Sequence, residues 1–157
     1  MMTQIPRVVT ATLLCLTPFT QAAAAEGSAL SPAEFQTRID ETVEPAGKAK
    51  APVACAGLVA ALRIAAPDGS NAKTTFSELE EEMVFYAMMT RRKAADEDQE
   101  TALAFTVPFV KAVSAVYLER FQHNQASRGE LLDEAVRANF AFCSDMRDEM
   151  KAALERS

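Results

Sequence analysis

Along most of the chain, apolar side chains recur at intervals of three and four residues, the period of helices that bury one face. A first helix is predicted over residues 32–43, where Phe35, Ile39 and Val43 stand four residues apart. A second, alanine-rich helix is predicted over residues 52–65, before the turn APDGSN. The hydrophobic pattern of this first part of the chain therefore predicts helices.

Three longer helical segments follow. The segment 76–95 has acidic residues in its first turns and basic residues in its last, which complements the helix dipole. The segment 97–126 is strongly apolar and contains Pro108, whose missing N–H should kink or split the helix. The last segment covers residues 127–155. Together these patterns predict an all-α, single-domain bundle of about five helices.

Three of the five helices carry the pattern of a capping box at their start. In this motif a Ser or Thr side chain and an acidic side chain three residues later bind each other's backbone N–H groups. The motifs read SPAE from Ser31, TFSE from Thr75 and SRGE from Ser127. We therefore expect helices to begin directly after these three residues.

The N-terminal segment has the layout of a secretory signal. Arg7 precedes an apolar stretch over residues 8–19, and four alanines at 22–25 offer sites for cleavage. The apolar stretch is shorter than the roughly 20 residues of a membrane span, which disfavours an uncleaved anchor. We expect residues 1–25 to be a signal peptide, residues 26–157 to form the helical domain, and the protein to be periplasmic or secreted.

The net charge of the chain indicates which classes of partner are disfavoured. The chain has 16 Lys and Arg against 22 Asp and Glu, a net charge of −6, and loss of residues 1–25 would remove only Arg7 among these. An acidic protein repels nucleic acid. We therefore expect no nucleic-acid partner, and no stable membrane span once the signal has been removed.

Two cysteines remain after residue 25, Cys55 and Cys143, because Cys15 lies within the predicted signal. Both fall on the apolar faces of their helices, and disulfides form in exported compartments. We expect a Cys55–Cys143 disulfide between the second and last helices. Two buried reduced thiols are the alternative, and a catalytic thiol would have only His123 as a histidine base. Near Cys55, Ala54, Gly57 and Ala61 should allow a neighbouring helix to approach closely.

The disulfide would join an early helix, containing VACAGLVAAL, to a late one, containing FAFCSDMRDEM. In this layout the chain resembles the small periplasmic immunity proteins of bacterial effector systems, which are also helical and carry one such disulfide. The resemblance concerns architecture alone and assigns no role to any residue.

The sequence carries no recognised catalytic or phosphate-binding motif. It has a single histidine, His123, and lacks the H-E-x-x-H, glycine-rich phosphate and EF-hand patterns. We therefore expect no cofactor and no metal. An enzyme is the less favoured interpretation, although the 22 acidic residues leave room for a hydrolase that uses a carboxylate pair.

Three functions stay open at this point. The first is a non-catalytic exported protein that binds another exported or envelope protein, as an inhibitor, immunity factor, chaperone or accessory subunit. The second is a carrier of an apolar small molecule or lipid in a cavity near Pro108, and the third is the hydrolase. The candidate lining of the carrier's pocket is Phe85, Met88, Met89, Phe105 and Phe109.

Intact mass of the protein from the exported fraction, alkylated with and without prior reduction, tests the predicted processing. We expect the loss of residues 1–25, with Cys55 and Cys143 alkylated only after reduction. An uncut chain whose cysteines are alkylated without reduction would contradict both expectations.

Overall fold

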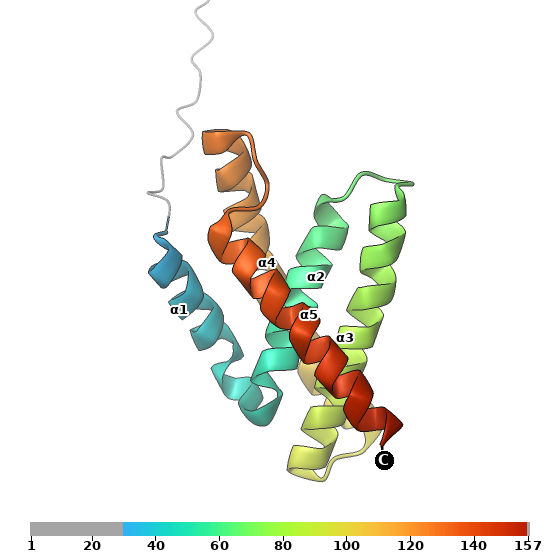
Figure 1. Ribbon diagram of the computed structural model, residues 1–157. Coiled ribbons are helices and arrows are strands. Elements are labelled where there is room, and N and C mark those ends of the chain that lie inside the picture. The colour runs from blue at the N-terminus through green and yellow to red at the C-terminus, as the bar shows by residue number, and fades with distance from the viewer. Residues whose placement is uncertain (1–29, 157) are drawn as a thin grey trace, which may run out of the picture.

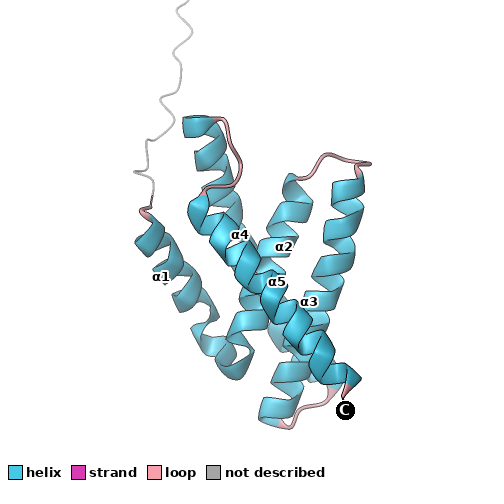
Figure 2. Ribbon diagram, in the orientation of Figure 1, coloured by secondary structure: helices cyan, strands magenta, loops and turns pink. Residues whose placement is uncertain are grey.

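The computed structural model describes residues 30–156, so the predicted signal peptide at 1–25 lies outside the described residues. The described chain is helical and contains no strand (Figure 2), which confirms the all-α class. The elements, in order, are α1 (Pro32–Val43), a 3-10 helix η1 (Glu44–Ala49), α2 (Lys50–Ala65), α3 (Asn71–Ala95), α4 (Gln99–Arg128) and α5 (Glu134–Glu155).

Helix α2 lies at the centre of the fold. It packs against α3 and α4 along much of its length, while α5 crosses in front of α2 and α3, and α1 lies on the side away from α3, at the left of Figure 1. Almost every residue of α2 from Pro52 to Leu62 is buried. Such a helix must be apolar on all sides, which explains its run of alanine, valine and leucine.

The close approach of α2 and α4 depends on Gly57. A Cβ atom added at Gly57 would lie 2.5 Å from the Cβ of Val113 on α4, which is closer than real Cβ contacts. The predicted close approach of a neighbouring helix is therefore confirmed at Gly57. Any larger side chain there would force α2 and α4 apart.

Helix α1 follows the sequence prediction at both ends. Glu34 N–H donates to Ser31 Oγ at 3.3 Å, and Ser31 N–H donates to Glu34 Oε2 at 2.8 Å. The capping box at Ser31 is thus confirmed. The inward side chains of Phe35, Ile39 and Val43 are buried as expected.

The capping boxes expected at Thr75 and Ser127 are wrong. Helix α3 begins five residues earlier than predicted, at Asn71, and the Ser70 side chain accepts from Lys73 N–H at 3.1 Å. Ser127 lies in the last turn of α4 and donates its hydroxyl to the His123 carbonyl at 2.8 Å. A Ser or Thr hydroxyl can bind the carbonyl four residues earlier within a helix, so the four-letter motif alone does not mark a helix start.

Of the two outcomes predicted for Pro108, a kink or a split, the split does not occur: α4 continues through Pro108 as one helix. Because proline has no N–H, Pro108 cannot donate the usual helical hydrogen bond to the carbonyl of Ala104. Both Pro108 and Ala104 are exposed. The missing hydrogen bond therefore falls where water can replace it. Among the described helices, α4 alone is long and apolar enough to cross a membrane; 39% of its most apolar window is buried in the fold, and the core helices of soluble proteins meet the same criteria.

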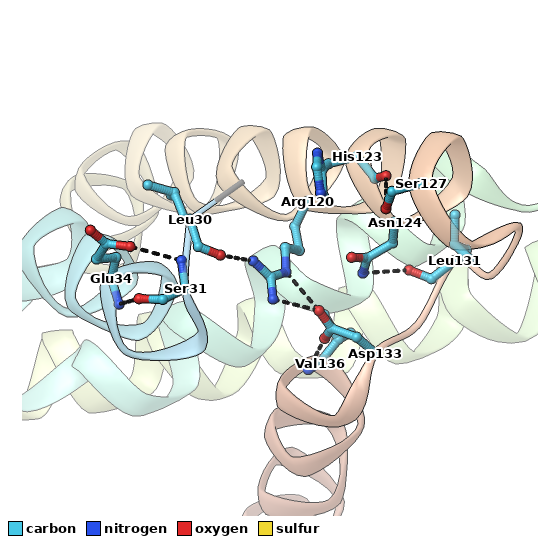
Figure 3. Close-up of polar contacts among 10 residues, drawn as sticks. All are labelled: Leu30, Ser31, Glu34, Arg120, His123, Asn124, Ser127, Leu131, Asp133 and Val136. Carbon is cyan, nitrogen blue, oxygen red and sulfur yellow. Dashed lines mark hydrogen bonds and ion pairs between the residues drawn. The ribbon is translucent and has the colours of Figure 1, made fainter. Parts of the chain in front are cut away.

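A buried ion pair joins α4 to the start of α5. Arg120 Nε donates to Asp133 Oδ2 at 2.7 Å, and both side chains are less than 10% exposed (Figure 3). Arg120 Nη1 also donates to the carbonyl of Leu30, and its guanidinium lies 5.1 Å from the ring centroid of Phe35. Arg120, on α4, thus links the residue that precedes the α1 cap to the N-cap residue of α5.

Asp133 has two tasks in this cluster. It is the N-cap of α5, where its Oδ1 accepts from Val136 N–H at 3.0 Å, and it is the partner of Arg120. Burial opposes its ionisation, but the hydrogen bonds from Val136 and Arg120 outweigh burial and lower the pKa of Asp133 below its usual value. Its carboxylate therefore stays charged under ordinary conditions.

Replacement of Asp133 by Ala should destabilise the fold by about 3–5 kcal/mol, because it leaves the Arg120 charge buried without its partner. Urea unfolding at neutral pH measures this change in free energy. Because the folded-state pKa of Asp133 is lowered, its contribution is lost as the pH falls through that pKa, so the difference from wild type should shrink below about pH 4.

The matched control is Glu130→Ala. Glu130 also pairs with an arginine, Arg137 at 3.2 Å, but both side chains of that pair are more than 60% exposed. Exposed pairs contribute little, so this variant should unfold close to wild type. Equal effects of the two variants would contradict the role assigned to the buried pair.

Candidate functional site

The predicted Cys55–Cys143 disulfide is confirmed. The two sulfur atoms are 2.03 Å apart, and the bridge joins α2 to α5 across 88 positions of sequence. Both cysteines are buried. The disulfide therefore lies inside the fold, where it fixes α5 to α2.

Helix α5 is attached along a narrow face. Within it, only Val136 and Cys143 are classed as buried, and two polar contacts lie on the same side at helical spacing. Asn139 Nδ2 donates to the Tyr117 hydroxyl at 2.9 Å, and Arg147 Nε donates to Glu82 Oε2 at 2.7 Å. The opposite side of α5 is left to solvent.

Glu82 anchors the second half of α5. It accepts from Arg147 and from the Tyr86 hydroxyl, the latter at 2.8 Å. Partial burial opposes the ionisation of Glu82, but these two hydrogen bonds outweigh it and lower its pKa. Burial, with Glu82 nearby, raises the pKa of Tyr86 to about 12, so Tyr86 stays a neutral donor.

A groove of about 570 Å³ lies between α1 and α5, with α2 and Tyr117 at its base. We call it the α1–α5 groove. Its apolar or sulfur-bearing lining consists of Ile39, Val43, Ala51, Ala54, Cys55, Tyr117, Ala138, Phe142 and Cys143. Its polar lining consists of Gln36, Asp40, Glu44, Lys50 and Asn139. The disulfide is therefore part of the base of the groove and also holds one of its walls.

The polar groups of the groove lie at its base and along its α1 edge. At the base, burial raises the pKa of Tyr117, which keeps its hydroxyl neutral beside Asn139. On the edge, Glu44 pairs with Lys50, and Asp40 accepts from Gln36 Nε2 at 2.9 Å. Asp40 is therefore an exposed carboxylate whose described side-chain partner is neutral.

Phe142 gives the groove its most unusual feature. Its side chain is 56% exposed, the largest value among the exposed large hydrophobic residues of the described chain. Phe140, two positions earlier, is also exposed. An aromatic ring left in water beside an apolar groove marks a surface suited to contact with another molecule.

The five residues predicted to line an apolar pocket lie on α3 and α4, and none of them lines the α1–α5 groove. The Phe105 and Phe109 rings are 5.0 Å apart, and Arg91 lies over Phe105 at 3.9 Å. Phe85 is 44% exposed, whereas Met88 is buried and Met89 half-buried. The fold thus brings Phe105 and Phe109 together but gives the five side chains different surroundings, and the pocket stays a prediction.

His123 and the carboxylates are the remaining candidates for catalysis or metal binding. His123 is half-buried near the end of α4 (Figure 3). No group of three or more His, Cys, Asp or Glu residues in the described chain is arranged to hold a metal. A carboxylate-pair hydrolase needs one carboxyl with a raised pKa. Where the pKa of a described carboxyl departs from its usual value, it is lowered.

No protein-family model, curated protein or solved structure matches this chain. Its function has to be argued from its own geometry.

Sequence reasoning missed the α1–α5 groove because the groove depends on how two distant helices cross. One signal was present in the sequence. In α5, Asn139, Cys143, Met146 and Met150 recur at three- and four-residue intervals on one face, and Phe142 stands at the flank of this face. A large aromatic residue beside the inner face of an amphipathic helix can indicate a contact surface.

Replacement of both cysteines by alanine should release α5 more than the rest of the fold, because α5 buries so few side chains. Loss of the cross-link should cost up to about 4.5 kcal/mol on the chain-entropy estimate for a loop of this length. Urea unfolding measures the loss, and hydrogen exchange locates it. We expect amides of α5 to exchange faster while those of α2 stay protected.

The reduced wild-type protein is the control and should behave like the double variant. The expectation would be contradicted if, after removal of the disulfide, the amides of α5 were still as protected from exchange as those of α2.

Proposed function

We propose that this protein is an exported, non-catalytic helical protein that acts by binding a protein partner in the α1–α5 groove. The observation that carries the proposal is Phe142, 56% exposed at the edge of a groove with an apolar base. Exposed aromatic residues beside a pocket are typical of the side chains that contribute most to protein–protein binding.

The rigidity of the groove supports the same function. One wall, α1, begins with a capping box, and the other, α5, is fixed by the disulfide and by the Asp133 cap. A binding surface that is already ordered loses little conformational entropy when a partner docks. The groove is thus suited to binding without rearrangement.

Export is part of the proposal and has two supports. The N-terminal sequence has the layout of a signal peptide. The disulfide is compatible with an oxidising compartment outside the cytoplasm. The partner would then be another exported or envelope protein.

A carrier of an apolar small molecule is the second candidate, because the groove's volume of about 570 Å³ falls within the range of small-molecule sites. Such sites usually bury most of the ligand. In the α1–α5 groove the aromatic edge is open to water, so a small apolar ligand would remain partly hydrated. This exposure favours a protein partner, which can cover Phe142 completely.

Photo-crosslinking in the source cell tests the proposal. A benzophenone amino acid placed at position 142 should form a discrete adduct with a protein, whereas the same group at position 85 should not. Phe85 is a suitable control because it is also an exposed phenylalanine but does not line the groove. An adduct with a small molecule at position 142 would instead support the carrier.

Direct binding completes the test. The crosslinked protein, once purified, should bind wild type and Phe85→Ala alike, and should bind Phe142→Ala roughly 30-fold more weakly, as expected for a central aromatic contact. Absence of a protein adduct at position 142, or equal affinity for both variants, would overturn the proposed function.

A further inference from the structure

We propose that the segment bound in the α1–α5 groove is a stretch of the partner protein with one apolar side chain flanked by Lys or Arg. This inference rests on the proposed function and adds the chemistry of the partner. It follows from the apolar base of the groove together with the sign of the charges that surround it.

The base of the groove offers a seat for one apolar side chain. Ile39 and Val43 present apolar carbon from α1, and the small residues Ala51 and Ala54 of α2 leave space between the walls. Phe142 stands on the opposite wall with much of its ring exposed. An inserted aliphatic or aromatic side chain would cover the Phe142 ring and remove both apolar surfaces from water.

The charges along the groove edge formed by α1, η1 and the start of α2 are mainly acidic. Asp40 and Glu44 both line the groove, and Lys50 is the single basic residue that does so. Lys50 is already paired with Glu44. Asp40 therefore remains as an exposed negative charge that a cationic side chain of the partner can approach.

The α5 wall adds negative charge beyond Phe142. Asp145 and Glu149 follow Phe142 by three and seven residues, so they share its side of the helix. Both are exposed, and neither takes part in an ion pair among the described residues. A partner segment that lies along the groove thus meets carboxylates on both walls.

The base also holds one polar group that can orient the segment. Asn139 donates to the Tyr117 hydroxyl, and its amide oxygen has no hydrogen-bond donor among the described residues. Asn139 lines the groove, so its amide oxygen can accept a backbone N–H or a Lys ammonium from the partner. The net charge of −6 of the whole chain would further favour the approach of a basic partner.

Selection from a display library of random 12-residue peptides tests this specificity. The oxidised protein recovered from the exported fraction is the target, and the selected peptides are the probes. We expect enriched peptides to contain an apolar residue with Lys or Arg within four positions. Their affinity should fall roughly tenfold between about 50 and about 300 mM salt, since rim charges are screened by salt.

Two variants and a matched control assign the binding to this groove. Phe142→Ala should weaken the selected peptides roughly tenfold by removing the apolar contact. The double variant Asp40→Asn/Asp145→Asn should weaken them several-fold. The control Asp96→Asn/Glu100→Gln makes the same change in charge at exposed positions outside the groove and should leave binding unchanged.

Enriched peptides without basic residues, equal loss in the control, or no peptide that depends on Phe142 would each overturn the inference. The crosslinked partner keeps the two proposals distinguishable. If position 142 captures a protein but mass spectrometry maps the adduct to a neutral or acidic segment, the partner chemistry proposed here is wrong while the proposed function stands.

Discussion

The covalent bond between α2 and α5 determines the shape of the candidate site. Helix α2 is surrounded by other helices and needs no further restraint, whereas α5 buries little beyond Val136 and Cys143. A helix attached along so narrow a face would pivot if it were held by packing alone. The disulfide removes that freedom near the middle of α5, so a largely solvated helix can serve as a rigid wall.

The ion pair of Arg120 with Asp133 performs a similar task at the start of α5. It holds the cap of α5 on α4 and also reaches Leu30, which precedes α1. The two walls of the groove therefore share one buried arginine at one end, while Glu82 and Arg147 tie α5 to α3 at the other. These polar contacts at both ends of α5, with the disulfide between them, hold the helix while its outer surface stays exposed to solvent.

Local signals in the sequence were enough to predict part of this fold. The bounds of α1, the burial of Phe35 and Ile39 and the close approach at Gly57 were predictable because each depends on nearby residues or on side-chain size. The starts of α3 and α5 were not, because Ser70 and Asp133 offered better caps than the motifs at Thr75 and Ser127. The α1–α5 groove could not be predicted from the sequence, because its two walls, α1 and α5, are far apart in the chain.

The separation of the two cysteines has a consequence for the order of assembly. Cys143 lies 88 positions after Cys55 and follows α1 to α4 in the sequence. In the proposed export, with the N-terminus leading, the Cys55–Cys143 bond could therefore form only after α1 to α4 had crossed the membrane. With two cysteines in the described chain, a single pairing is possible and no disulfide exchange is needed to correct it. Oxidation would then be the last step of assembly, and it would fix α5 as a wall of the α1–α5 groove only in chains that had been exported almost whole.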